Sequence, residues 1–425
     1  IRTRTARAGV IGLGYVGLPL LIEFAKAGFD VLGFDVNQAR VDAIGRGESY
    51  LEDVTVDDIR KVVAGGRLRA TTGFDELSNL DTVNICVPTP LRKTKDPDLS
   101  FVVAAVDEIA RHLRPGQLII LESTTYPGTV EEVVKPKLEA TGLLAGQDFF
   151  LAFSPERVDP GNVEWPTSRI PKVVGGIDED STRVATALYE QIIEKVVPVS
   201  SARVAEMVKL LENTFRAVNI GLANEFALMC RDLDVDVWEV IEAAETKPFG
   251  FMPFYPGPGL GGHCVPIDPF YLSWKARQVG FESRFIELAG HINGGMPRHV
   301  VQQISDALNS RSRSINGSIV HLFGVAYKPG VSDTRESPAL DILKLLLERG
   351  AVVRYTDPFV EVVTAGDVKL EAMTLEEALA GGIDCAVITT AHAQIDYAEI
   401  ARRVPVVVDT RNALKRVKAG HIFRL

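Results

Sequence analysis

Apolar and polar positions follow a repeating pattern along the first part of this chain. Up to Ser200, short runs rich in β-branched residues alternate with stretches in which apolar residues recur every three or four positions. The short runs are typical of buried strands and the longer stretches of amphipathic helices, so their alternation predicts a doubly wound parallel sheet. The expected strands cover Ala8–Leu13, Asp30–Asp35, Thr82–Val87, Gln117–Glu122, Phe149–Phe153 and Val196–Val199.

Two local signals support the helices that connect these strands. The pattern of Gly17–Ala27 is helical, and Gly28 follows it as a C-terminal cap. Asn37 stands where the N-cap of the next helix is expected, because its short side chain accepts hydrogen bonds from the first turn.

The middle of the chain has a different pattern. From Ser201 to Cys230 there is no proline, and apolar residues recur at spacings of three and four, which predicts one long helix with a continuous apolar face. The residues of this face are Val204, Val208, Leu211, Phe215, Val218, Leu222, Phe226 and Met229. Asp236 and Glu239 favour the start of another helix. The segment from Lys247 to Pro269 is rich in glycine and proline and predicts a long loop, and such loops are usually functional.

Strands and helices alternate again after Arg311. Ser337 and Pro338 indicate a helix start, with serine as the cap. We therefore expect an α/β fold in which a long central helix joins two doubly wound, Rossmann-like domains, and a cleft between domains is a common ligand site. The expected domains are 1–200, 201–310 and 311–425. The C-terminal strands are expected at Ser318–Phe323, Ala351–Thr356, Asp384–Thr389 and Pro405–Asp409.

Composition narrows the class of protein. The chain has 425 residues, 46% of them hydrophobic and 24% charged, which is the balance of a globular protein. Its net charge of −10 argues against nucleic acid as a partner, since phosphate backbones require a basic surface. There is no run of about 20 apolar residues, the length that spans a membrane. The four cysteines lack CxxC spacing, so we expect neither a disulfide framework nor a metal site. We expect a cytoplasmic protein.

A dinucleotide fingerprint follows the first expected strand. Gly12, Gly14 and Gly17 match GxGxxG, in which the glycines allow a tight turn, close approach of a pyrophosphate, and close packing of helix on strand. Asp35 ends the next strand, where its carboxylate can accept ribose hydroxyls and repel a 2′-phosphate, which favours NAD over NADP. Arg40 suits either cofactor.

The glycine-rich loop contains a cysteine, Cys264. Glycine beside a cysteine keeps the sulfur accessible. A thiolate that adds to an aldehyde gives a thiohemiacetal, whose oxidation gives a thioester that water hydrolyses, so one site can remove two hydrides in sequence. The alternative, a small buried residue, is the interpretation that we prefer for Cys86, Cys230 and Cys385.

Polar residues in three other places are candidates for this chemistry. Lys209 and Asn213 lie one turn apart on the long helix, with Arg216 three residues further, and a lysine and an asparagine can stabilise an oxyanion. A solvated polar face is the alternative. The segments Glu122–Thr125 and Ser154–Arg157 each follow a strand, where open α/β sheets bind ligands and where a carboxylate can activate water.

Together these residues resemble the UDP-glucose/UDP-N-acetylhexosamine 6-dehydrogenase family over nearly the whole chain. The most specific match is GxGGxCxxxD, found at Gly259–Asp268. Further matches are Lys209–Asn213 and Ala326–Pro338. The resemblance implies that Cys264 is the nucleophile and that Asp268 assists proton transfer and hydrolysis. It also implies that Lys209 and Asn213 stabilise oxyanions.

The family pattern implies further roles. Thr124 and Glu156 would hold or activate water, Lys328 would contact the substrate, and Arg335 would reach the cofactor. The implied cofactor-binding residues are Gly12, Gly14, Tyr15, Val16, Gly17, Asp35, Arg40, Thr89, Thr124 and Arg335. The implied substrate-binding residues are Arg157, Val158, Lys209, Asn213, Arg216, Tyr255, Gly259 and Lys328.

The expected reaction is NAD-dependent oxidation of the C6 hydroxyl of a UDP-sugar to a carboxylate. The UDP-glucose branch has a second glutamate where Pro160 falls here, and its loop before the cysteine differs from Thr246–Gly259. The expected substrate is therefore UDP-GlcNAc first, UDP-GalNAc or UDP-ManNAc next, and UDP-glucose last. A two-electron dehydrogenase of the 6-phosphogluconate type and a non-catalytic nucleotide-sugar-binding regulator are the alternatives. The long apolar helix also favours a homodimer or higher homo-oligomer.

Overall fold

The structure is a computed structural model that describes residues 1–51, 54–91, 96–158, 165–262, 264–366, 368–417 and 419–425. Contacts divide the chain into two compact units. The N-terminal unit contains residues 1–212 and 270–280, and the C-terminal unit contains residues 213–269 and 281–425. The expected fold class, two Rossmann-like α/β parts and a long central helix, is confirmed. The three-domain division stays a prediction.

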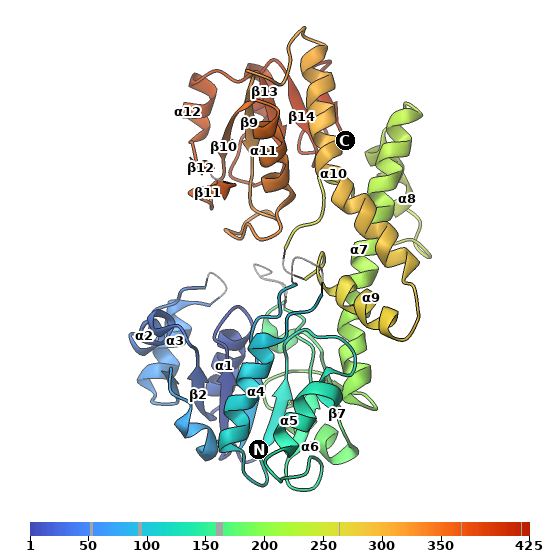
Figure 1. Ribbon diagram of the computed structural model, residues 1–425. Coiled ribbons are helices and arrows are strands. Elements are labelled where there is room, and N and C mark those ends of the chain that lie inside the picture. The colour runs from blue at the N-terminus through green and yellow to red at the C-terminus, as the bar shows by residue number, and fades with distance from the viewer. Residues whose placement is uncertain (52–53, 92–95, 159–164, 263, 367, 418) are drawn as a thin grey trace. The chain divides into compact units, whose positions relative to one another are not determined.

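The N-terminal unit is built on an eight-stranded sheet of order β3-β2-β1-β4-β5-β6-β7-β8. The strands of this sheet are coloured from blue to green in Figure 1. Neighbouring strands run parallel except β6 and β7. The sequence did not predict β3 or β7. The strand β6 ends where expected, and the other predicted strands end one to two residues early because the chain turns away into loops at their carboxyl ends. The strands are β1 Arg7–Ile11, β2 Asp30–Phe34, β3 Leu68–Thr71, β4 Thr82–Ile85, β5 Leu118–Leu121, β6 Phe150–Phe153, β7 Lys172–Gly176 and β8 Val196–Pro198.

Helices and two large apolar clusters complete this unit. The two expected caps are confirmed: Gly28 has a φ of +102° after the first helix, and the Asn37 side chain accepts a hydrogen bond from the Ala39 N–H. The helices are α1 Gly17–Lys26, α2 Gln38–Gly45, α3 Val56–Ala64, α4 Ser100–His112, α5 Lys135–Glu139 and α6 Glu179–Tyr189, with short turns of helix at Asp75–Asn79, Val130–Val134 and Thr167–Arg169.

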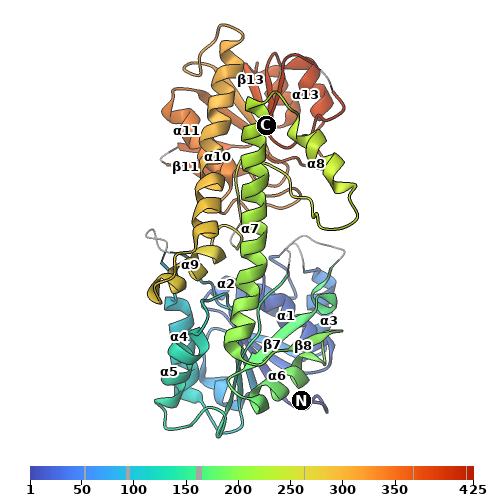
Figure 2. The ribbon, with the colours of Figure 1, turned by 90° about the vertical axis from the view of Figure 1, so that its right-hand side faces the viewer.

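The long central helix is α7, Ala202–Asp232, and it continues from one unit into the other. Most of its predicted apolar face is exposed in the single chain, Leu211 by 63%. The exposed residues of the predicted face are Val204, Leu211, Phe215, Leu222, Phe226 and Met229, and Met207, which was not predicted to belong to it, is exposed as well. Figure 2 shows α7 beside α10, Arg284–Asn309, and buried Asn224 and Asn293 join the two helices by a hydrogen bond of 2.9 Å. The pattern therefore predicted the helix correctly, and the structure adds that the chain itself leaves most of this face exposed.

The C-terminal unit has a parallel five-stranded sheet of order β10-β9-β13-β14-β15. Its strands are β9 Ile319–Phe323, β10 Val352–Thr356, β13 Cys385–Ile388, β14 Val407–Asp409 and β15 Ile422–Arg424, with a hairpin of β11 Val362–Ala365 and β12 Val368–Glu371. Its other helices are α8 Val237–Glu245, α11 Pro338–Glu348, α12 Leu375–Ala380 and α13 Tyr397–Arg403, and α9 is Asp268–Gln278. β15 and the hairpin were not predicted.

Three expectations for local structure in this part of the chain have different outcomes. Asp236 caps α8 by accepting hydrogen bonds from the Trp238 and Glu239 N–H groups, as expected. Ser337 stands at the N-cap of α11, but its buried hydroxyl makes no capping bond. The loop after Lys247 ends one residue before Asp268, which is the first residue of α9 and was placed in the loop. Within the described residues, no helix is both long and apolar enough to cross a membrane.

Candidate active site

The glycine fingerprint has the geometry that a dinucleotide needs. Gly12 has a φ of +93°, and a Cβ there would lie 2.7 Å from the Cys86 carbonyl oxygen. A Cβ on Gly17 would lie 1.9 Å from the Gly12 carbonyl oxygen, so both positions exclude a side chain. At Gly14, by contrast, no atom lies within 4 Å of a built Cβ. The open space is therefore at the glycine that a pyrophosphate approaches, and the residues fit NAD.

Asp35 supports the same turn from the second strand. Its buried carboxylate accepts hydrogen bonds from the Leu13 N–H at 2.9 Å and from the Asn37 N–H at 2.9 Å. The Arg40 guanidinium lies 3.2 Å from the same carboxylate. Arg40, which suits either cofactor, is thus paired with Asp35, the residue that favours NAD over NADP.

The strands β4 and β5 bring Thr89 and Thr124 to the same edge of the sheet. Thr89 follows β4 and Thr124 follows β5, and these strands are parallel neighbours. The Thr89 carbonyl accepts a hydrogen bond of 2.8 Å from the Tyr271 hydroxyl. Tyr15, in the glycine turn, is 36% exposed.

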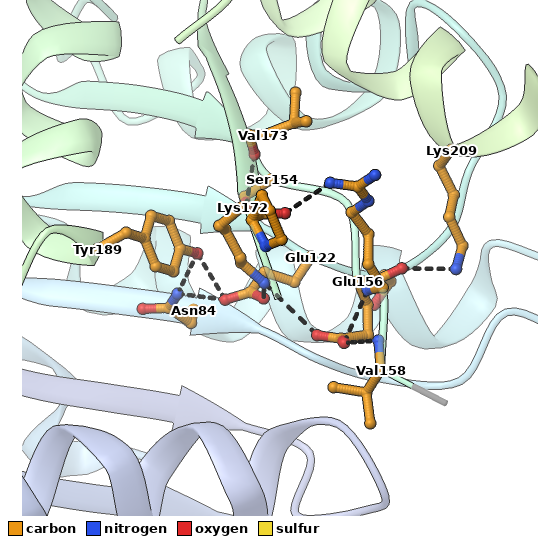
Figure 3. A network of polar contacts seen from close by, with 12 residues as sticks. Asn84, Glu122, Ser154, Glu156, Val158, Lys172, Val173, Tyr189 and Lys209 are labelled. Carbon is orange, nitrogen blue, oxygen red and sulfur yellow. Dashed lines mark hydrogen bonds and ion pairs between the residues drawn. The ribbon is translucent and has the colours of Figure 1, made fainter. Parts of the chain in front are cut away.

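Glu156 follows β6 and organises the backbone around it (Figure 3). Its Oε1 accepts the N–H groups of Arg157 at 2.8 Å and Val158 at 2.5 Å. Its carbonyl oxygen accepts a hydrogen bond of 2.5 Å from the Lys209 ammonium. Lys209 and Asn213 are both buried, so the alternative of a solvated polar face is wrong for these two residues.

Arg157 and Arg216 are both implied to bind substrate, but other protein groups hold Arg157 and the side chain of Arg216 is exposed. The Arg157 guanidinium lies 2.6 Å from the Glu212 carboxylate and donates to the Pro171 carbonyl at 2.6 Å, so its side chain is committed within the protein. Arg216, three residues beyond Asn213 on α7, is exposed.

A buried ionic network stands behind Glu156, and sequence reasoning missed most of it. Lys172 Nζ lies 2.5 Å from Glu122 Oε2 and 3.5 Å from Glu156 Oε2. Glu122 also accepts hydrogen bonds of 2.6 Å from Asn84 and from Tyr189 (Figure 3). Burial opposes the charge of Lys172, but the carboxylates of Glu122 and Glu156 outweigh burial and raise the pKa of Lys172 above its usual value. The sequence feature that could have indicated this network is Lys172, a lysine at the start of an apolar strand.

The cysteines divide as expected. Cys86, Cys230 and Cys385 are buried, and burial raises the pKa of the Cys86 and Cys385 thiols, which keeps them protonated and unreactive. Cys264 is partly exposed. Within the described part of the chain, no three His, Cys, Asp or Glu side chains are grouped so as to hold a metal.

Cys264 leads directly into α9. Its carbonyl oxygen accepts the N–H of Asp268 at 2.8 Å. The buried Asp268 carboxylate accepts a hydrogen bond of 2.5 Å from the Asn213 amide on α7. Two of the residues implied to be catalytic are thus in contact. His263 and Pro160 lie outside the described residues.

The loop before Cys264 packs against the loop that contains Lys328 and Arg335. The Gly262 N–H donates to the Arg335 carbonyl at 3.0 Å, and a Cβ on Gly261 would lie 2.7 Å from Tyr327 Cβ. The Arg335 guanidinium lies 2.6 Å from the Asp333 carboxylate. Gly259 has a φ of +139°, and a Cβ there would lie 3.0 Å from Pro338. Tyr255, also implied to bind substrate, is exposed and donates to Glu245 at 2.8 Å.

Arg411 is a further candidate that the sequence reasoning missed. It follows β14, and its Nε donates to the Thr389 carbonyl at 2.8 Å. A Cβ on Gly257 would lie 2.6 Å from its Nη1, so the guanidinium lies against the glycine-rich loop. Burial lowers the pKa of Arg411 to about 10. A cation at the carboxyl end of a parallel strand suits an anionic ligand, and its place after a strand was the available signal.

Models of three domains of one family match this chain. Residues 6–193 match the NAD binding domain of the UDP-glucose/GDP-mannose dehydrogenase family, residues 203–294 its central domain, and residues 321–416 its UDP binding domain. The chain belongs to this family. It is therefore an NAD-dependent nucleotide-sugar dehydrogenase, as the sequence predicted, and the non-catalytic alternative is wrong.

Individual relatives differ in the sugar that they are named for. A UDP-N-acetyl-D-mannosamine dehydrogenase of Pyrococcus horikoshii is 36% identical, with 98% of each chain covered, and its solved structure matches with a TM-score of 0.90. A UDP-N-acetyl-D-glucosamine 6-dehydrogenase of Pseudomonas aeruginosa is 37% identical, with 84% of each chain covered. An NDP-N-acetyl-D-galactosaminuronic acid dehydrogenase of Ralstonia nicotianae is 34% identical, with 96% of this chain and 97% of that one covered.

Proposed function

We propose that this enzyme oxidises C6 of a UDP-N-acetylhexosamine from the alcohol to the carboxylate, through a covalent intermediate on Cys264. When bound, NAD supplies the hydride acceptor, and each of the two oxidations uses one NAD molecule. Gly12, Gly14, Gly17 and Asp35 would hold it, because the space at Gly14 and the carboxylate of Asp35 fit a pyrophosphate and a ribose.

The residues act in two stages. In the first, the C6 hydroxyl loses its proton, carbon C6 loses a hydride, and the oxygen of the resulting aldehyde is bound by the Lys209 ammonium and the Asn213 amide. In the second, the Cys264 thiolate forms a C–S bond to C6, and the same donors stabilise the resulting oxyanion. Loss of a hydride from that adduct gives a thioester. Water then adds to the carbonyl, the C–S bond breaks, and the thiolate and the uronate are released.

Glu156 and Thr124 are proposed to position this water. The Glu156 carboxylate accepts two backbone N–H groups and lies 3.5 Å from the Lys172 ammonium, so its position is fixed. We therefore propose that Glu156 acts by holding the water and the Lys209 ammonium in place. Asp268, bound to Asn213, is proposed to receive protons at the Cys264 turn.

The observation that carries the proposal is the contact of Asn213 with Asp268 beside Cys264. Both side chains are buried, and a hydrogen bond of 2.5 Å joins Asn213 to Asp268, the first residue of α9. Cys264 is partly exposed, whereas the other three cysteines are buried. A structural cysteine needs none of this arrangement, whereas a nucleophile needs both exposure and a nearby group that can receive its proton.

The test is NADH formation at 340 nm with limiting UDP-sugar. We expect two NADH per sugar for the wild type, whereas a two-electron dehydrogenase would give one. Cys264→Ser should strongly slow the second oxidation, and Cys230→Ala, which changes a buried cysteine of α7, should keep the stoichiometry of two. Full four-electron turnover by Cys264→Ser would exclude the covalent route.

The sugar is the finer part of the proposal. UDP-GlcNAc is the substrate that the loop before Cys264 favours. UDP-ManNAc is the second candidate, because the Pyrococcus relative named for it covers 98% of this chain. A panel of UDP-GlcNAc, UDP-ManNAc, UDP-GalNAc and UDP-glucose at equal concentration, compared by kcat/KM, separates them. UDP-glucose as the best substrate would contradict the ranking.

The exposed stripe of α7 supports a homo-oligomer. Its apolar residues continue at helical spacing from Val204 to Met229, and a soluble monomer rarely exposes so long an apolar face. We propose that a second copy covers it around a two-fold axis. Leu211→Glu should shift the sedimentation coefficient toward that of a monomer, and Leu144→Glu, at an exposed leucine elsewhere, should not. A cytoplasmic location stays a prediction.

A further inference from the structure

Helix α9 begins at the Cys264 turn, but the rest of it packs in the N-terminal unit. From Phe270 to Gly280 the chain belongs to that unit by its contacts, although the residues on both sides of this segment do not. The short segment therefore connects the thiol-bearing turn to the half of the chain that binds NAD.

Tyr271 makes the first attachment. Its side chain is fully buried, and its hydroxyl lies 2.8 Å from the Thr89 carbonyl and 3.2 Å from the Pro90 carbonyl. These two carbonyls lie in the loop after β4, whose first residue, Cys86, packs against Gly12 of the cofactor turn. The hydroxyl thus fixes a loop at the edge of the sheet where the cofactor binds.

Trp274 and Lys275, one turn later, make the second attachment. The Trp274 ring lies 5.0 Å from the Tyr126 ring, and Lys275 Nζ lies 5.0 Å from the same ring and 2.6 Å from Glu132. Tyr126 stands two residues after Thr124, in the segment that follows β5. Helix α9 therefore holds the loops of two neighbouring strands.

The start of the helix is attached to Cys264. The Cys264 carbonyl accepts N–H groups from Ile267 at 2.9 Å and from Asp268 at 2.8 Å, so the cysteine backbone is bound to the first turn of α9. A helix is stiff over this length, and a change in its position is passed to both ends.

We propose that α9 is a connector through which NAD binding restrains the Cys264 thiol, and that Tyr271 is the positioning residue of this connector. The proposal deepens the proposed function, since it assigns a control to the same nucleophile. In this connector, NAD binds beside Thr89 and Thr124, the residues around them hold α9 through Tyr271 and Trp274, and α9 holds the turn at Cys264. A ligand changes the behaviour of a distant group only if its binding free energy differs between the two states of that group. Here the two states are the restrained and the unrestrained turn at Cys264.

The test is the rate of alkylation of Cys264 by iodoacetamide, followed by peptide mass spectrometry with and without saturating NAD. The three buried cysteines serve as internal references. In the wild type, NAD should slow alkylation about fivefold, the size of effect that one or two hydrogen bonds give. In Tyr271→Phe, which removes only the hydroxyl, saturating NAD should change the rate by less than about twofold.

Tyr355→Phe is the matched control. Tyr355 is equally buried, and its hydroxyl donates to the Val360 carbonyl in the C-terminal unit. This variant should keep the full effect of NAD. Trp274→Leu removes the second attachment and should also reduce the effect, so the proposal stays testable if Tyr271→Phe does not fold.

The outcomes separate this inference from the proposed function. An unchanged NAD effect in both α9 variants would mean that NAD shields the thiol directly, and the connector would be refuted. No NAD effect in a wild type that forms two NADH per sugar would refute the connector alone. Four-electron turnover by Cys264→Ser would refute the covalent mechanism and leave the alkylation result to be judged by itself.

Discussion

Replacing Glu206 by glutamine should remove a pH dependence of stability that the wild type shows between pH 5 and pH 8. Glu206 lies on α7 and is 1% exposed. Its carboxylate accepts the N–H groups of Gly128 at 2.5 Å and Val130 at 2.9 Å, which anchor the segment that follows Thr124. Burial outweighs these hydrogen bonds and raises the pKa of Glu206 from 4.5 to about 7.

The magnitude follows from linkage. Because the folded state binds this proton more tightly than the unfolded state, the protonated carboxyl contributes stability that is fully present below pH 4.5 and is lost as the pH rises through about 7. Each unit of pKa difference corresponds to about 1.4 kcal/mol, so the contribution of Glu206 falls by about 2.5 kcal/mol between pH 5 and pH 8.

Urea unfolding followed by circular dichroism at pH 5, 6, 7 and 8 measures this change. The quantity is the difference in unfolding free energy between wild type and Glu206→Gln. The amide nitrogen of glutamine faces one of the two N–H groups, which adds an offset that does not vary with pH. The difference in unfolding free energy should change with pH, and the wild type should gain stability relative to Glu206→Gln as the pH falls from 8 to 5.

Glu377→Gln is the control of opposite sign. Hydrogen bonds from Thr374 lower the pKa of Glu377, so its contribution is present above its unfolded pKa and is constant from pH 5 to pH 8. A flat difference for Glu206→Gln as well would show that Glu206 ionises normally and would refute the electrostatic reasoning.

Three further substitutions test other parts of the site. Gly14→Ala should leave the melting temperature unchanged but raise the KM for NAD. Gly17→Ala, with a Cβ 1.9 Å from a carbonyl oxygen, should lower the melting temperature. If both variants raised the KM equally and neither changed the melting temperature, this reasoning would be contradicted. Lys172→Met should cost about 3–5 kcal/mol in urea unfolding, since it leaves buried carboxylates unpaired, and adding Glu122→Gln should recover part of the loss. Arg411→Gln should weaken the binding of UDP in titration calorimetry at least tenfold, about 1.4 kcal/mol, and unchanged affinity would exclude Arg411 from the nucleotide site.

Local patterns predicted the elements that depend on neighbouring residues. The glycine turn, the cap at Asn37 and the helix Ala202–Asp232 follow from spacing within a few residues, and the structure contains all three. The strand β7 did not follow, because its apolar run is short and its partner β6 runs antiparallel across a long connection.

Side-chain partners far apart in sequence were beyond such patterns. Lys172 lies 50 residues from Glu122 and 67 residues separate Glu122 from Tyr189, so no spacing rule connects them. Periodicity also cannot say what covers an apolar face. The stripe through Leu211 was predicted as a face, and only the structure shows that the chain itself leaves it exposed.

The boundaries between the two units fall beside the residues that are proposed to be catalytic. One lies between Glu212 and Asn213 within α7, and another between Pro269 and Phe270 at the start of α9. Because a helix rises about 1.5 Å per residue, four residues place Asn213 about 6 Å along the axis from Lys209. The hydrogen bond from Asn213 then fixes Asp268 and, through α9, the turn at Cys264. Helical continuity in α7 thus holds Asn213 one turn from Lys209, so the two proposed oxyanion donors stay next to each other although the boundary between the units lies between them.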